Sequence, residues 1–132
     1  MLSDLMNIIQ NITFKASAHD VFELIMDSKK HTKFTRHKAV ISRKVGGKFK
    51  AYGDYIEGKN IEIIQDKKIV QSWRASDWPK KVYSKVTFEF IQSKNNTKLK
   101  FTQEGVPEAQ YADLKQGWID FYWKLMKKYL RE

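Results

Sequence analysis

Because this 132-residue sequence contains no cysteine, its three histidines are the first candidates for acid–base or metal chemistry. His19, His31 and His37 do not stand at the i, i+4 spacing that places two imidazoles on one helical face around zinc. The last two lie in a stretch rich in Lys and Arg, where nearby positive charge disfavours both a metal ion and the protonated ring. The GxSxG nucleophile motif and the GxxxxGK[ST] phosphate loop are also missing. We therefore expect no enzyme activity, no metal and no cofactor.

Positive charge is the second chemical feature, since 25 Lys and Arg against 15 Asp and Glu give a net charge of +10. No acid stands between Asp27 and Asp54. Nine basic residues do: Lys29, Lys30, Lys33, Arg36, Lys38, Arg43, Lys44, Lys48 and Lys50. Such local charge favours an acidic protein partner, attracted at long range, and we expect the first seven residues to dock it. A solvated face is the alternative.

Nucleic acid ranks below both readings of the basic stretch. Of the 25 basic residues 21 are Lys, which lacks the two-pronged hydrogen-bonding geometry of Arg. Recognised nucleic-acid-binding motifs are also missing from the sequence. We expect no contact with nucleic acid.

Aromatic residues allow two readings. Seven are expected to point between a sheet and a helix: Phe49, Trp73, Phe88, Phe90, Phe101, Trp118 and Tyr122. They could fill a solid core or line a cavity for a small apolar ligand, and the solid core is favoured because ligand pockets usually add convergent polar groups. Trp78, beside Pro79 in an expected loop, is either an exposed anchor for a partner or a plug packed on its own domain.

These residues must be positioned by a strand, two short helices, a run of strands and a long helix. The strand covers residues 8–15, Ser17 caps the first helix and Ser28 the second. Turn signals then recur at short intervals: Gly46-Gly47, Gly53-Asp54, Asp66-Lys67, Asp77 to Lys80, and Asn95-Asn96. Between them apolar and polar residues alternate, which predicts antiparallel strands with one buried face.

A long amphipathic helix is predicted beyond Pro107, which suits a first helical position, and it should cover the apolar face of the sheet. The chain is therefore expected to be one α+β domain over residues 1–132. Because it contains neither a secretory signal nor an apolar run long enough for a membrane span, we expect a cytoplasmic protein without membrane contact.

Several short motifs occur in this order: Lys33-Phe34-Thr35-Arg36, Val45-Gly46-Gly47-Lys48-Phe49, Glu57-Gly58, the segment 68–74 ending in Trp73-Arg74, Trp78-Pro79, Glu104-Gly105-Val106-Pro107, and Gln116-Gly117-Trp118. With them the sequence resembles the helix-grip (Bet v 1-like, START-like) superfamily. Within it the sequence is most similar to the C-terminal domain of the activators of the heat shock protein 90 ATPase. The resemblance implies a curved antiparallel sheet of about six or seven strands wrapped on the long C-terminal helix.

The same resemblance implies a cochaperone that binds heat shock protein 90 and favours its closed, ATPase-competent state. Full-length activators also have an N-terminal domain that grips the chaperone's middle segment, whereas only about seven residues precede the first predicted strand here. We expect that domain to be absent, so the resemblance implies binding ahead of strong stimulation of the ATPase. The alternative function is that of a START-like protein that binds a small apolar ligand between sheet and helix.

Overall fold

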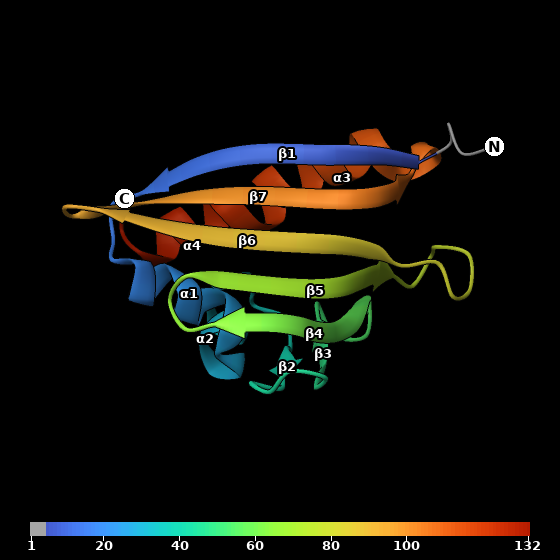
Figure 1. Ribbon diagram of the computed structural model, residues 1–132, viewed down its shortest axis with the longest axis horizontal. Helices are drawn as coiled ribbons and strands as arrows, with labels where there is room; N and C mark the ends of the chain where they lie inside the picture. Colours follow the sequence, from blue (N-terminus) through green and yellow to red (C-terminus); the bar gives the residue numbers. More distant parts are fainter. Residues whose placement is uncertain (1–4) are drawn as a thin grey trace.

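A seven-stranded antiparallel sheet and a C-terminal helix lie face to face in the computed structural model, which describes residues 5–132 (Figure 1). The strand order is β1-β7-β6-β5-β4-β3-β2, so the first and last strands of the chain pair with each other. In Figure 1 the helices all lie on the same side of the sheet, with the C-terminal helix behind β1, β7 and β6. The predicted α+β arrangement is confirmed, with seven strands.

The strands and helices follow one another in the predicted order. The strands are β1 (Leu5–Phe14), β2 (Val40–Ile41), β3 (Lys48–Ala51), β4 (Ile56–Ile64), β5 (Lys68–Ala75), β6 (Ser84–Ser93) and β7 (Asn96–Pro107). The helices are α1 (Ala18–Met26), α2 (Ser28–Thr35), η2 (Glu108–Gln110), α3 (Tyr111–Trp118), η3 (Ile119–Trp123) and α4 (Lys124–Tyr129). None of the helices within residues 5–132 has the length and apolar character that a membrane crossing would need.

Alternation places the aromatic residues of the central strands inside. In β6, Val86, Phe88 and Phe90 are buried, and the residues between them are exposed or half-buried. Leu99 and Phe101 of β7 are buried in the same way. A strand with a period of two therefore presents one apolar face to the helix, as predicted.

The caps of the two short helices differ in how well they were predicted. Ser17 caps α1, since its hydroxyl accepts a hydrogen bond from the Asp20 amide at 3.1 Å. The prediction for α2 is wrong, because Asp27 is its cap and accepts from the Lys30 amide at 2.9 Å. Ser28 is already helical, and its hydroxyl instead accepts from the Ile41 amide at 2.8 Å. That bond ties α2 to β2.

The C-terminal helix is continuous but changes its winding. Pro107 ends β7, so its predicted place inside the helix is wrong, and a 3₁₀ turn from Glu108 leads into α3. The segment η3 has π geometry, with the Lys124 amide bonded to the Ile119 carbonyl. This wider turn adds a residue per turn and lets Trp118, Tyr122 and Trp123 all point into the core, each at most 5% exposed.

Trp118 is the centre of the packing between helix and sheet. Its ring lies 4.4 Å from Phe101, 5.6 Å from Trp73 and 4.7 Å from Tyr122, measured between centroids. Its indole N–H donates to the buried Gln103 side chain at 2.7 Å. The helix is therefore held both by aromatic contact and by a buried hydrogen bond.

The glycine of the Glu57-Gly58 pair allows strands β3, β4 and β5 to pack closely. A Cβ atom on Gly58 would overlap the Ser72 carbonyl oxygen and lie 2.7 Å from the Phe49 ring. Gly117 is a matched comparison, since a Cβ there meets only Phe121 at an ordinary 3.8 Å.

We predict that Gly58→Ala lowers the free energy of unfolding by about 3 kcal/mol, because the backbone of β5 cannot move aside. Gly117→Ala should raise it by roughly 0.5–1 kcal/mol, since alanine loses less entropy than glycine in a helix. Urea unfolding of both variants measures these changes. Equal stability of the two variants would contradict the close approach of strands at Gly58.

Candidate partner-binding surface

The seven basic residues predicted to dock a partner are all exposed and come from neighbouring elements. They are Lys29, Lys30 and Lys33 on α2, Arg36 at its end, Lys38 in the next loop, and Arg43 and Lys44 between β2 and β3. The Ala39 amide donates a hydrogen bond to the Thr32 hydroxyl at 3.0 Å, which joins α2 to this loop. Figure 1 shows α2 and β2 at the same end of the sheet. We call these seven residues the basic edge.

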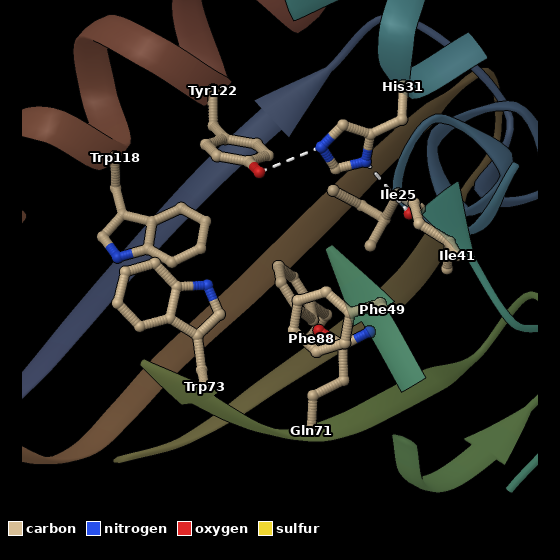
Figure 2. A pocket seen from close by; sticks show the side chains of 9 residues that line it. All are labelled: Ile25, His31, Ile41, Phe49, Gln71, Trp73, Phe88, Trp118 and Tyr122. Atoms are coloured by element: carbon tan, nitrogen blue, oxygen red, sulfur yellow. Dashed lines mark hydrogen bonds between the residues drawn. The ribbon is translucent and has the colours of Figure 1, made fainter. Parts of the chain in front are cut away.

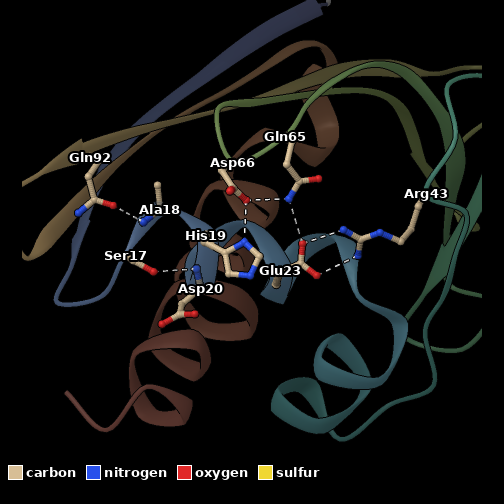
Figure 3. Close-up of polar contacts among 9 residues, drawn as sticks. All are labelled: Ser17, Ala18, His19, Asp20, Glu23, Arg43, Gln65, Asp66 and Gln92. Atoms are coloured by element: carbon tan, nitrogen blue, oxygen red, sulfur yellow. Dashed lines mark hydrogen bonds and ion pairs between the residues drawn. The ribbon is translucent and has the colours of Figure 1, made fainter.

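Arg43 differs from the other members of the basic edge because it is paired within the chain. Its guanidinium donates to both carboxylate oxygens of Glu23, at 3.0 and 2.7 Å (Figure 3). The hydrogen bond to Glu23 raises the pKa of Arg43. Within residues 5–132 the other six form no ion pair. The positive field of the edge therefore comes mainly from those six.

His19, Glu23 and Asp66 bring three potential metal ligands within 4.8 Å of one another (Figure 3). His19 Nδ1 lies 2.9 Å from Asp66 Oδ1, and this hydrogen bond raises the pKa of His19. Both carboxylate oxygens of Glu23 already accept hydrogen bonds from Arg43. A metal ion bound to Glu23 would therefore lie beside the positively charged guanidinium. The arrangement is that of a polar clamp between α1 and the β4–β5 turn.

Trp78 is buried, at 4% exposed, so the reading as an exposed anchor is wrong and the reading as a plug is correct. Its ring packs 5.4 Å from that of Trp73. Arg74 donates to the Trp78 carbonyl at 2.7 Å and to Glu57 at 3.2 Å, which folds the loop back over the sheet. The Trp73-Arg74 and Trp78-Pro79 motifs are thus one packing unit.

The interior between helix and sheet is nearly solid. A small cavity of about 10 Å³ lies there, with room for about a single water molecule (Figure 2). Five of the seven predicted lining residues surround it: Phe49, Trp73, Phe88, Trp118 and Tyr122. Phe90 packs instead against Phe22, and Phe101 against Trp118. A filled core therefore stays the favoured reading, and Trp73, Trp118 and Tyr122 also line the larger open groove described below.

Two polar residues, His31 and Gln71, also line this cavity, and the sequence analysis did not predict them there. His31 is 4% exposed, and its Nδ1 donates to the Ile25 carbonyl at 3.2 Å, so its Nε2 accepts from the Tyr122 hydroxyl at 2.9 Å (Figure 2). Burial lowers the pKa of His31 to about 4 and raises that of Tyr122 well above its ordinary value. A neutral imidazole therefore links α2 to the C-terminal helix.

Two open grooves lie along the C-terminal helix. The smaller, about 290 Å³, lies between α2 and α4. The larger, about 730 Å³, has Asp77, Asp113 and Asp120 in its lining and neither Lys nor Arg. The Tyr52 hydroxyl donates to the Phe121 carbonyl and joins the β3–β4 turn to the helix beside the larger groove. Burial raises the pKa of Tyr52 to about 12.

Comparison with known proteins identifies the family of this chain. Residues 15–131 match the family model described as "Activator of Hsp90 ATPase homolog 1-like protein". The chain belongs to this family. A crystal structure of an HSP90 activator from Plasmodium falciparum is similar, with a TM-score of 0.89 and 30% identity over 95% of this chain and 96% of that chain. The predicted family and helix-grip fold are confirmed.

Curated relatives carry activator names but are longer. The Dictyostelium discoideum "activator of 90 kDa heat shock protein ATPase homolog" is 33% identical over 106 residues, 80% of this chain and 28% of that protein. Human "activator of 90 kDa heat shock protein ATPase homolog 1" is 26% identical over 116 residues, 88% of this chain and 34% of that protein. The chain spans about a third of the length of these relatives.

We predict that His31 makes stability fall in acid. Its ordinary pKa of 6.5 applies to the unfolded chain, whereas the folded pKa is about 4, so between these values only the unfolded chain takes up the proton. The free energy of unfolding should therefore drop by about 3 kcal/mol from this residue as pH falls from 6.5 to 4.

Urea unfolding of wild type and His31→Gln across this pH range measures the effect, because glutamine can keep both hydrogen bonds without titrating. The variant should lose this part of the pH dependence. Parallel curves for the two proteins would show that His31 does not carry it.

Proposed function

We propose that this chain is a cochaperone domain that binds the heat shock protein 90 chaperone through the basic edge and favours the closed state that hydrolyses ATP. The observation that carries the proposal is the family match over residues 15–131. The Plasmodium falciparum protein, described as an HSP90 activator, supports it further, since it has nearly the same length of chain and the same fold.

The charge distribution supports the basic edge as the docking surface. Six exposed cations on and beside α2 form no ion pair within the described residues, and no acid lies between positions 27 and 54 to offset them. An acidic partner surface would be attracted over a Debye length of about 8–10 Å and aligned before contact. The interaction is therefore expected to depend on salt.

Binding alone can account for activation. A partner accelerates an ATPase limited by closure if it prefers the closed arrangement, and about 1.4 kcal/mol of preference gives a tenfold change. No side chain of this chain needs to take part in hydrolysis.

The alternative function is to carry a small apolar ligand between sheet and helix, and the cavity in the core is too small for one. The cavity of about 10 Å³ in the core is far below the roughly 300 Å³ at which ligand pockets begin. The larger groove of about 730 Å³, which Trp73, Trp118 and Tyr122 also line, is open to solvent and has three aspartates in its lining. His31 and Tyr122 satisfy each other at its wall rather than offering free polar groups.

Isothermal titration calorimetry of the purified chaperone with this chain tests the proposal. We expect binding at low salt that weakens as salt is added beyond physiological ionic strength, because exposed charge pairs are screened. The absence of binding at low salt, with or without ATP, would overturn the proposal.

We predict that the triple variant Lys29→Glu, Lys30→Glu, Lys38→Glu slows association with the chaperone by roughly tenfold or more, since charge reversal turns steering into repulsion. Its fold should be intact, because Lys29 and Lys30 lie in the first turn of α2, where acidic residues favour the helix dipole.

The matched control is Lys15→Glu, Lys94→Glu, Lys98→Glu, which makes the same change in net charge at exposed positions just after β1 and on the β6–β7 hairpin. Stopped-flow association rates compare the two variants. Equal slowing would mean that net charge alone acts, and the basic edge would lose its assignment as the docking surface.

A further inference from the structure

The smaller groove combines positive charge with an apolar floor. It lies between α2 and α4, about 290 Å³ in volume, and its lining residues are Lys33, Phe34, Thr35, Arg36, Leu125, Lys128 and Tyr129. Lys128 joins the two cations of the basic edge although it lies more than 90 positions further along the chain. The fold thus assembles three cations around one concavity.

None of these three cations is neutralised by the chain. Lys33, Arg36 and Lys128 are exposed, form no ion pair within residues 5–132, and the groove contains no Asp or Glu in its lining. Like charges gathered at one groove repel one another, and a carboxylate placed among them relieves that repulsion. The rim therefore favours an anionic occupant.

The floor selects the kind of anion. Phe34 is buried, Leu125 is half-buried and Tyr129 is 38% exposed, so an apolar side chain entering the groove would lose water on several sides. A bare inorganic anion or a phosphate would leave this apolar surface unused. A short stretch of polypeptide with acidic residues beside an apolar one would use both rim and floor.

The larger groove would set the direction in which a segment binds in the smaller one. It shares Thr35 and Leu125 with the smaller one, and its lining includes Asp77, Asp113 and Asp120. Acidic residues would be repelled from that side and held at the side of α4. Two adjoining grooves of opposite charge would thus fix the direction of a bound segment.

We infer that the groove between α2 and α4 binds an acidic linear segment of the partner, with carboxylates at Lys33, Arg36 and Lys128 and one apolar side chain on the floor formed by Phe34 and Leu125. This inference rests on the proposed function for the identity of the partner. It specifies which residues the bound segment of the partner has: acidic ones beside an apolar one.

The probe is a short fluorescent peptide of Glu and Asp with one central Leu, followed by fluorescence anisotropy against the full chain. Three comparison probes match its length: one with amides in place of all acids, one with Gly in place of Leu, and an oligonucleotide of equal charge. We expect the acidic peptide with Leu to bind most tightly of the four.

The groove variant is Lys33→Gln, Arg36→Asn, Lys128→Gln, and its control is Lys15→Gln, Lys94→Gln, Lys98→Gln. Asparagine is chosen at Arg36 because that residue has a φ of 63°, a left-handed conformation that Asn tolerates well. The groove variant should bind the peptide roughly tenfold more weakly, since each exposed charge pair is worth about 1.4- to 5-fold, and the control should bind like wild type.

Equal binding to both variants, equal binding of the amide probe, or tighter binding of the oligonucleotide would overturn the inference. The result is separable from the proposed function because the chaperone is not in the assay. If the chaperone binds wild type and groove variant equally, the groove and the docking role of Lys33 and Arg36 fail, while binding to the chaperone stands. If the peptide needs the groove but the chaperone does not bind at all, only the proposed function fails.

Discussion

The structure depends on how the C-terminal helix is held against the sheet, and Trp118 is the side chain that holds it. Its ring lies among Phe101, Trp73 and Tyr122, and its N–H is satisfied by the buried Gln103. Gln103 in turn donates to the hydroxyl of Ser84 at 2.9 Å, so the polar group brought into the core is fully partnered. Removing the indole would leave both a cavity and an unsatisfied amide.

This packing decides where a partner can bind. The aromatic rings between helix and sheet leave a cavity of about 10 Å³ among them, so a polypeptide partner is expected on the outer surfaces. Two grooves lie along the helix and share Thr35 and Leu125; the one at α4 has basic residues in its lining and the one beside α3 and η3 has acidic residues. The first adjoins the basic edge, so fold and charge lead to the same part of the molecule.

Much of this fold was predictable because strand alternation and turn residues are local signals. The buried faces of β6 and β7 and the cap at Ser17 follow from residues close in sequence. The burial of Trp78 could not be predicted from the residues of its own loop. It depends on how the loop folds back on β5, where Trp78 packs against Trp73 and its carbonyl accepts a hydrogen bond from Arg74. Asp27 displaced Ser28 as a cap since either residue type can cap, and backbone geometry chooses between them.

The candidate site was partly predictable for the same reason. The charge of α2 is contiguous in sequence, whereas Lys128 reaches it only because α4 packs on α2. His31 could not be assigned from its basic surroundings, because its pKa is set by burial among Ile25 and Tyr122. No local motif in the sequence predicts the π turn at η3.

The decisive test of the proposed activation is the ATP turnover of purified heat shock protein 90, measured with rising amounts of this chain. We expect a rate that rises and saturates, and that returns toward the basal value as salt screens the basic edge. An unchanged rate at concentrations where calorimetry shows the chaperone to be fully bound would contradict it.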